Sequence, residues 1–536
     1  MPSSRPVKIE FPLSGENRSG GYSKRTAPYS TPRAVNVRSV GPLEGRGRGG
    51  SRPGLSKLVN TAFLSFTGLS PVTYITSAGA HKHVLVAICD GNLYVVDGSA
   101  ESPAVYAYLT TDDGNYVITD SGDRIIFNAT VSAVPPLGGS NTFQMAESNG
   151  RLYIATAGVD DATDYTLVRF NPLTGVIENV TNAPVNQPLV CVYQQRVVLS
   201  GADHMFYACA VGDDTDWSFA KDMGNPGRAF AGHLGGNTIG EPIKAMVPYE
   251  DKALVLATND GVWVIYGNFA GEGGRRVRIS QSVGVISPSG IAVAPGGTVL
   301  MLARDGLYSF VIGSDAPPQP FSDKVVPDEF IDIDPTTVAI TMQYDYRSRG
   351  FHLFLTPDHG VGTHWWIDIA NRAMWPVKLS DDHQPLCACE LKTSGFSNII
   401  LGCSDGYLRR FDDDAEDDDG TDVQSDLFLG PFHTSREEGY EGQITEIVGA
   451  LAAESGEVTW RIVVGDSAEE AVDAADAALN GDRTTGVDSS GTWSAGQNRV
   501  EYPRARGAWV VIWLSSTKPW AFESMTAWMR KLGRIR

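Results

Sequence analysis

Short apolar runs alternate with polar turns along most of the chain, and one arrangement recurs: an apolar strand, an Asp-Gly pair and a second apolar strand. It occurs around Asp90–Gly91, Asp260–Gly261, Asp305–Gly306 and Asp405–Gly406. An Asp-Gly pair between apolar runs predicts a β-hairpin with a type I′ turn, in which both central residues need positive φ. Recurrence at long spacing predicts stacked β-units rather than a single sheet with an active site. An enzyme is therefore less expected.

Seven such units can be aligned between residues 70 and 430, each with three or four strands in about 40 to 50 residues, the size of a β-propeller blade. Their inner strands are expected to begin near Val72, Thr142, Pro188, Pro242, Ser289, Val338 and Pro385. Each blade buries both faces against its neighbours, and ring closure protects the strand edges. We therefore expect an all-β fold, with an irregular β-propeller of about seven blades over residues 58–424.

The two ends of the chain differ from these units. Residues 425–536 contain strand-like runs and one helical pattern, which Ser467 and Glu470 open as a capping box and Gly481 follows. They predict a small β-sandwich-like domain that carries one helix. Residues 1–57 are rich in Pro, Gly, Ser and Arg and show no hydrophobic period. They predict an extended arm that orders against a neighbour, so that its removal should leave the propeller folded.

Charge separates the arm from the rest of the chain. The 536 residues carry a formal net charge of −20, whereas residues 1–57 hold 11 Lys or Arg against 3 acidic residues. This asymmetry predicts a basic arm that docks on an acidic surface, and an acidic body that disfavours tight binding to DNA. The alternative, that the charge serves only solubility, is equally compatible with the sequence. The acidic run at 412–420 is expected to be a solvated loop or linker.

Cysteine usage and hydropathy bear on the compartment. The six cysteines include no CxxC pair and form no dense framework, which fits folding in a reducing compartment. The N-terminus has no apolar core of a signal peptide, and we find no run of about 18 apolar residues that would cross a membrane. We therefore expect neither a signal peptide nor a membrane segment.

Three local patterns resemble sites but lack the context that each requires. Gly402–Gly406 matches GxSxG, yet a nucleophile elbow needs a helix after the serine and here a second strand is expected. Gly45–Gly50 matches GxGxxG without the strand, helix and acidic residue of a dinucleotide site. His81 and His83 share a strand face, but no third ligand is near in sequence. We assign no catalytic, cofactor-binding or metal residue.

The glycine-rich arm carries a different expectation. Its glycines allow close backbone contact, and its arginines can bridge carboxylates on another subunit. The residues expected to dock on a partner are Arg38, Arg46, Arg48, Arg52 and Pro53.

Four features follow one another along the chain: the arm PRAVNVRSVGPLEGRGRGGSRPGL (32–55), the irregular propeller, the segment VYQQRVVLSGADHMFYACAVGDDTDW (192–217), and a tail with FLGPF (428–432), WSAGQN and RARGAWVVIWLSSTKPWAFE. In this order they resemble the tail hub or nozzle (tail tubular) protein of short-tailed bacteriophages, whose arm has a GR-x-R-x-G-x-RPGL opening. The resemblance covers nearly the whole chain.

The resemblance implies a non-enzymatic virion protein that forms a homo-oligomeric ring, commonly a hexamer, around the DNA ejection channel. The implied partners are other copies of the chain, the portal or adaptor proteins, tail fibres and double-stranded DNA in passage, with no cofactor. The implied location is the virion tail, assembled in the host cytoplasm. The acidic body agrees with this reading, because an acidic wall repels phosphate and lets DNA slide. The chain length leaves both the hub and the distal nozzle position open.

Two other classes of function remain open. A tail-associated, glycan-degrading propeller enzyme needs two or three carboxylates that converge at the mouth of the ring, which a sequence cannot show. A cellular propeller interaction scaffold has the same blade pattern, and only the basic arm and the C-terminal domain argue against it.

Overall fold

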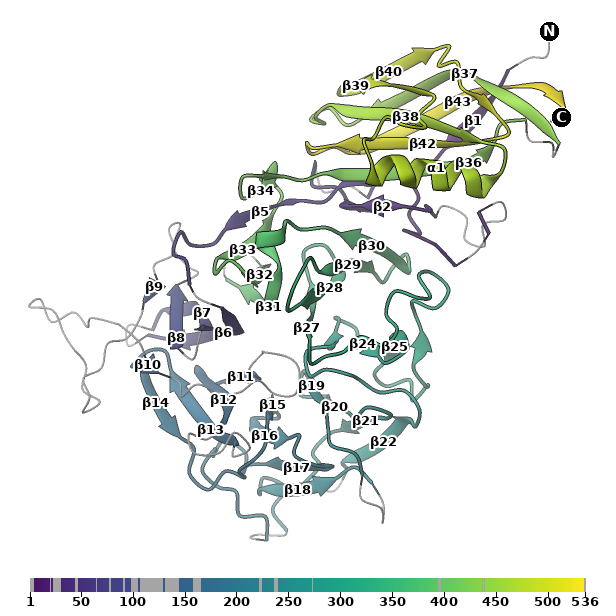
Figure 1. Cartoon of the computed structure of the whole chain (residues 1–536). Helices are drawn as coiled ribbons and strands as arrows, with labels where there is room; N and C mark the ends of the chain where they lie inside the picture. Colours follow the sequence, from purple (N-terminus) through teal and green to yellow (C-terminus); the bar gives the residue numbers. More distant parts are fainter. Residues whose placement is uncertain are drawn as a thin grey trace, which may run out of the picture.

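The structure is a computed structural model of the chain. It describes residues 4–534 except 20, 23–29, 44–46, 64, 77–78, 90–91, 98–104, 107–128, 131–143, 158–164, 221–223, 236–239, 272, 394–396, 436 and 438. Within this part the fold is all-β apart from one α-helix and a short 3-10 turn. The expected fold class is confirmed: seven antiparallel sheets form the ring of a β-propeller, and a β-sandwich stands against one side of it (Figure 1).

The first four blades follow one another in chain order. Blade 1 contains β6 (Phe66–Ile75), β7 (His81–Cys89) and β8 (Asn92–Asp97), with the short strands β9 (Val105–Tyr106) and β10 (Ala129–Thr130). Blade 2 contains β11 (Met145–Ser148), β12 (Arg151–Ala157), β13 (Tyr165–Asn171) and β14 (Val176–Asn179). Blade 3 contains β15 (Leu189–Tyr193), β16 (Arg196–Ser200), β17 (Met205–Ala208) and β18 (Phe230–His233). Blade 4 contains β19 (Ala245–Tyr249), β20 (Ala253–Ala257), β21 (Val262–Tyr266) and β22 (Arg275–Ser280).

The last three blades complete the ring. Blade 5 contains β23 (Ile291–Val293), β24 (Thr298–Ala303), β25 (Gly306–Val311) and β26 (Gln319–Pro320). Blade 6 contains β27 (Val338–Asp345), β28 (Gly350–Pro357), β29 (Thr363–Asp368) and β30 (Ala373–Val377), followed by the 3-10 turn η2 (Asp381–His383). Blade 7 contains β31 (Pro385–Lys392), β32 (Ser397–Cys403) and β33 (Leu408–Asp412), and its inner strand β31 contacts β6 of blade 1. Closure therefore joins the last blade to the first.

The fourth strand of blade 7 comes from the N-terminal end of the chain. The strand β5 (Gly54–Lys57) pairs antiparallel with β33, and the short strands β34 (Asp417–Asp418) and β35 (Thr421–Asp422) extend the same sheet. A Cβ atom at Gly54 would overlap the carbonyl oxygen of Asp417, so glycine permits this close approach. The boundary expected at residue 57 thus falls inside a blade, because the open edge of β33 needs a partner strand.

The expected hairpins form, but the type I′ turn is wrong. In the hairpin β24–β25, Arg304 and Asp305 lie at the centre of the turn, and only the following Gly306 has positive φ, 143°. In β32–β33, Gly406 again follows the turn with φ 83°, after Ser404 and Asp405. The glycine therefore ends the turn, as in a type I turn with a bulge, and does not occupy its centre. The Asp90–Gly91 pair lies outside the described residues.

The C-terminal domain is a sandwich of two sheets. One contains β36 (Ser425–His433), β42 (Trp509–Ser516), β38 (Val458–Gly465) and β39 (Ser489–Trp493). The other contains β43 (Phe522–Arg534), β37 (Tyr440–Leu451), β40 (Gly496–Glu501) and β41 (Arg506–Gly507). The helix α1 (Ala468–Asn480) lies against β36, β38 and β42. As predicted, Ser467 accepts a hydrogen bond from the amide of Glu470, and Gly481 ends the helix.

The N-terminal segment joins both domains. The strand β1 (Arg5–Ile9) pairs with β43 at the edge of one sandwich sheet, and β2 (Ala34–Val35) pairs with β36 at the edge of the other. The strands β3 (Val37–Arg38) and β4 (Gly50–Ser51) pair with each other, and β3 contacts β30 of blade 6 and β36 of the sandwich. One hydrophobic cluster includes Trp375 of blade 6, Leu401 of blade 7 and Ile512 of the sandwich. Propeller and sandwich therefore share a core.

Candidate docking site at the junction of propeller and sandwich

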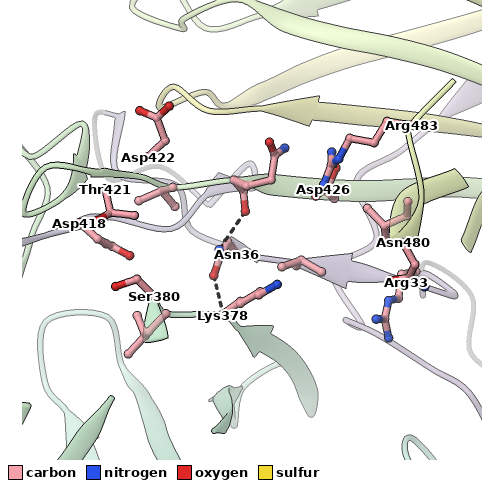
Figure 2. A pocket seen from close by; sticks show the side chains of 15 residues that line it. Arg33, Asn36, Lys378, Ser380, Asp418, Thr421, Asp422, Asp426, Asn480 and Arg483 are labelled. Carbon is pink, nitrogen blue, oxygen red and sulfur yellow. Dashed lines mark hydrogen bonds and ion pairs between the residues drawn. The ribbon is translucent and has the colours of Figure 1, made fainter. Parts of the chain in front are cut away.

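A pocket of about 240 Å³ opens where the arm passes between the two domains. Figure 2 shows Lys378 and Ser380 entering it from the propeller, Asn480 from the end of α1, and Arg483 from the loop after the helix. Asn36 of the arm lies between them. Three segments that are far apart in sequence thus build one cavity, which is why no local pattern could reveal it.

The side of the pocket next to the sandwich is fixed by ion pairs. Both terminal nitrogens of Arg483 donate to the carboxylate of Asp426, at 2.9 and 3.0 Å, and the indole nitrogen of Trp513 donates to the same carboxylate at 2.9 Å. A bidentate pair of this kind holds both side chains in one geometry. These groups shape the wall rather than remain available to a ligand.

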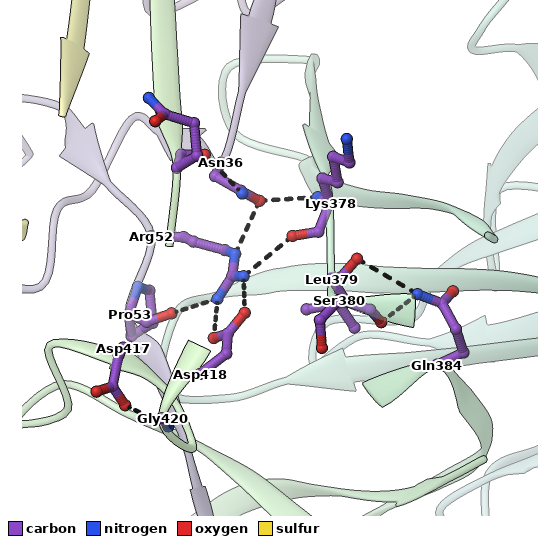
Figure 3. Close-up of polar contacts among 11 residues, drawn as sticks. Asn36, Arg52, Pro53, Lys378, Leu379, Ser380, Gln384, Asp417, Asp418 and Gly420 are labelled. Atoms are coloured by element: carbon purple, nitrogen blue, oxygen red, sulfur yellow. Dashed lines mark hydrogen bonds and ion pairs between the residues drawn. The ribbon is translucent and has the colours of Figure 1, made fainter. Parts of the chain in front are cut away.

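Arg52 forms the centre of a second network beside the pocket (Figure 3). Its Nε donates to Asn36 at 2.9 Å, and Nη1 donates to Asp418 at 2.8 Å and to the carbonyl of Pro53 at 2.8 Å. Nη2 donates to the carbonyl of Lys378 at 3.1 Å and also to Asp418. The arm, blade 6 and the acidic run after blade 7 therefore meet on one guanidinium.

Both charges of this pair are buried, at 2% exposure for Arg52 and 3% for Asp418. A buried ion pair is tolerated only where further hydrogen bonds satisfy its remaining donors and acceptors, as Asn36 and the backbone carbonyls do here. Asp418 belongs to the run 412–420, so the expectation that this whole run is solvated is wrong. Asp418 is accommodated in the interior by its ion pair with Arg52.

Arg38 is also buried, at 2% exposure, but it has no comparable network. Its guanidinium lies 5.3 Å from the ring centre of Trp366 and 5.1 Å from that of Phe411. Its Nε and Nη2 have no hydrogen-bond partner, and burial lowers the pKa of Arg38 to about 9. The two aromatic faces supply part of the stabilisation that a carboxylate would give.

The remaining predicted docking residues also face the chain itself or lie outside the described part. Arg48 forms an ion pair with Glu523 of the sandwich, and Pro53 is buried. Arg46 lies outside the described residues. The arginines of the arm were expected to bridge carboxylates on another subunit. Arg48 and Arg52 instead form ion pairs with Glu523 and Asp418 of the same chain. The groups on the pocket rim that remain for a partner are the exposed Lys378 and Asp422, which the sequence did not single out.

The rim of the pocket presents one basic and one acidic side chain to solvent. Lys378 supplies an ammonium donor and Asp422 a carboxylate acceptor, and in the described structure neither has an ion-pair partner within 4 Å. The GxSxG serine, Ser404, lies in a turn between two strands and donates to the carbonyl of Asp382 at 3.1 Å. A nucleophile elbow requires a helix after the turn, which this hairpin does not have.

Among the described residues, no cluster of three or more His, Cys, Asp or Glu side chains is suited to hold a metal ion. None of the helices in the described ranges has the length and apolar character needed to cross a membrane.

Comparisons with known proteins give no family for the chain. No family model matches the chain, and no curated protein matches it. Similar solved structures include a chain of the mitotic checkpoint complex, with TM-score 0.38 and 8% identity over 67% of this chain and 94% of that one. They also include the N-terminal domain of Nup159, with TM-score 0.36 and 10% identity over 67% of this chain and 95% of that one. The WD40 β-propeller domain of Doa1 matches with TM-score 0.36 and 10% identity over 67% of this chain and 97% of that one. All three TM-scores lie below 0.5, so the β-propeller assignment rests on the sheets of this chain and not on these matches.

Proposed function

We propose that this β-propeller protein is a structural subunit of a bacteriophage tail, at the hub or nozzle, and acts without catalysis. Its copies form a homo-oligomeric ring, expected to be a hexamer, around the channel through which DNA is ejected. The ring docks on the portal or adaptor proteins and offers sites to tail fibres. The order of arm, propeller and C-terminal domain in the sequence suggested this role.

One observation supports the proposal most: the arm ties the two domains into one body. The segment 32–55 that carries the resemblance contributes β2 to the sandwich and begins β5 of blade 7. Its arginines neutralise Asp418 and Glu523, on either side of the junction. A part that transmits force between portal and tail tip needs such a connection, because a flexible linker would let its two domains move apart.

The charge of the body supports a DNA conduit. A protein with a net charge of −20 repels phosphate, so a wall made of it has low affinity for the genome. The cysteines in the described residues are buried and form no disulfide, which agrees with assembly in the host cytoplasm. Docking to the portal or adaptor would use exposed groups such as Lys378 and Asp422, since Arg52 and Arg38 are enclosed.

The test is to locate the protein in a particle. Tailed-phage particles produced with an affinity tag at the C-terminus of this chain would be labelled with gold and viewed by electron microscopy. Label at one position on the tail axis is the expected result. Label on no part of the tail, in particles that contain the protein, would overturn the proposal.

A propeller interaction scaffold is the second candidate, and the blade architecture itself favours it. Function is carried by sites rather than by fold, so the two candidates differ in partner and not in structure. The third class, a glycan-degrading enzyme, is separated from both by a polysaccharide-degradation assay with the purified chain. Release of oligosaccharides would identify the enzyme.

A further inference from the structure

Blades 3 and 4 form an apolar pocket at their outer rim. It has a volume of about 210 Å³ and is lined by Phe206, Phe230, Ile265 and Phe269, with the backbone of Gly232. The three phenylalanine rings lie 5.3 to 5.9 Å apart, in one cluster. An open aromatic pocket of this kind suits an aliphatic or aromatic side chain of a partner.

A row of arginines borders the pocket on the strand β22. Its sequence begins Arg275-Arg276-Val277-Arg278, and all three arginines are exposed. Arg275 forms an ion pair with Asp315 at 2.6 Å. Arg276 donates to the carbonyl of His233, and Arg278 donates to the carbonyl of Ser280 at 3.1 Å. Neither Arg276 nor Arg278 has a carboxylate partner in the described part of this acidic chain.

The strand β22 is also the free edge of its blade. Within the described part of the chain it pairs only with β21, and with six residues it is longer than the outer strands of blades 2, 3 and 5. An exposed edge presents unpaired backbone groups on which a second extended segment can dock. One surface therefore carries the phenylalanine pocket, the arginines Arg276 and Arg278, and the free edge of β22. We call this surface the blade 3–4 rim.

A complementary surface lies elsewhere on the same chain, in the connection between blades 5 and 6. Residues 327–335 read PDEFIDIDP and contain acidic charges only. Phe330 is buried at 1% exposure and packs 5.6 Å from the ring of Trp365, whereas the next residue, Ile331, is 48% exposed. Asp328 and Asp332 beside it are exposed as well.

This connection is held in place before any partner binds. The amide of Asp332 donates to the carbonyl of Arg304 at 3.1 Å, and Glu329 accepts a hydrogen bond from Arg18 at 3.1 Å. A preorganised segment loses little conformational entropy on binding. It presents one aliphatic side chain among carboxylates, and the blade 3–4 rim presents one apolar pocket among guanidinium groups.

We infer that the segment 327–335 of one copy docks on the blade 3–4 rim of the next, with Ile331 in the phenylalanine pocket and its aspartates on Arg276 and Arg278. The two surfaces occupy different places on the propeller, so the contact is head-to-tail and repeats from copy to copy. Such a contact builds a ring where its rotation closes. The inference rests on the proposed ring and names the interface that forms it.

The test compares the wild-type full chain with three variants. The rim variant carries Arg276→Glu and Arg278→Glu, and the segment variant carries Asp328→Arg and Asp332→Arg. The control carries Arg151→Glu and Arg349→Glu, the same substitutions as the rim variant but at exposed arginines outside both surfaces. Sedimentation velocity reports the assembly state of each, and circular dichroism reports whether each remains folded.

Wild type and control are expected to assemble, and each interface variant alone is expected to be monomeric. An equimolar mixture of the two variants should assemble again, because a reversed rim meets a reversed segment and the unchanged surfaces meet each other. Recovery on mixing cannot come from a misfolded protein. If a charge variant does not fold, Ile331→Ser takes its place, and a sedimentation coefficient equal to that of wild type would contradict the inference.

Other outcomes separate this interface from the ring itself. Interface variants that assemble like the wild type would overturn the interface and leave the proposed ring standing. A wild-type chain that remains monomeric in solution would also overturn the inference, since the contact uses residues of this chain alone. The tail role would then still be decided by the labelled particles.

Discussion

At the scale of single residues, the junction depends on buried charge. Arg52 and Asp418 are both buried, and the three guanidinium nitrogens of Arg52 each donate at least one hydrogen bond. Removing one member of a buried pair leaves the other charge desolvated and alone, which costs far more than the pair contributes when intact. Arg52 is therefore the residue whose loss should weaken the junction most.

We expect Arg52→Leu to lower the free energy of unfolding by about 3 to 5 kcal/mol, as for other broken buried pairs. Chemical denaturation followed by tryptophan fluorescence measures it, since Trp375 and Trp520 lie in the core that the two domains share. Arg52→Leu combined with Asp418→Leu should cost less than the two single changes added together. Additive costs would show that the two side chains do not interact.

Buried histidines give the protein a pH dependence. Burial lowers the pKa of His364 to about 4, well below its value of about 6.5 in an unfolded chain. Between these values the unfolded state binds a proton that the folded state does not, so the fold loses stability as the pH falls from 6.5 to 4. His352 behaves in the same way: burial is the main cause that lowers its pKa to about 4.

We expect the free energy of unfolding to fall by up to about 1.4 kcal/mol per pH unit for each such histidine in this window. His364→Gln should reduce the slope of unfolding free energy against pH by up to the contribution of one proton, about 1.4 kcal/mol per pH unit. This holds whether or not the substitution changes the stability at pH 7. Denaturation curves at several pH values from 7 to 4.5 measure the slope. An unchanged slope would mean that His364 titrates alike in both states.

Sequence reasoning failed for the arginines at this scale for a physical reason. Arginine in a Gly-rich segment without hydrophobic period is typical of an exposed arm, and Arg38 and Arg52 have no local feature that distinguishes them from Arg48. Their burial depends on Trp366, Asp418 and other groups more than 300 residues away. The expectation of close backbone contact holds at Gly50, where an added Cβ would overlap the carbonyl oxygen of Trp520, and fails at Gly47, which faces open space.

At the scale of elements, local hairpins were predictable and long-range strands were not. The sequence places inner strands near Val338 and Pro385, where β27 and β31 begin, because alternation and turn residues are local signals. The pairing of β5 with β33 joins positions more than 350 residues apart in the chain. Nothing in the arm itself indicates that four of its residues complete a blade.

Deletion of residues 1–57 should therefore destabilise both blade 7 and the sandwich. It removes β5 from blade 7 and the edge strands β1 and β2 from the sandwich, so we expect a lower melting temperature and rapid proteolysis near β33. Deletion of residues 1–9 alone removes only β1 and is the matched control, with a propeller as resistant as in the full chain. Equal protease resistance of blade 7 in both deletions would contradict the role of β5.

The helix offers a smaller test. Ser467 accepts a hydrogen bond from the amide of Glu470 at 3.1 Å. We expect Ser467→Ala to cost about 1 kcal/mol of stability, the usual value for a lost N-cap. Ser467→Asp keeps the acceptor and should restore the stability measured by thermal denaturation. A loss as large with aspartate as with alanine would show that the cap is not the cause.

At the scale of the whole molecule, two β-domains share a core and are joined by one N-terminal segment. This arrangement, a net charge of −20 and the order of parts along the chain support a rigid, non-catalytic subunit of a larger assembly. The composition and repeats predicted the propeller and the sandwich. They could not predict the junction or the blade 3–4 rim, because residues of separate blades and domains meet there only after folding.

The central claim is that several copies of this chain form a ring on a tail. Native mass measurement of the tail complex that contains the chain tests it most directly. The account predicts that the chain is present in an integer number of copies greater than one, with six expected. A single copy in an intact complex would contradict it.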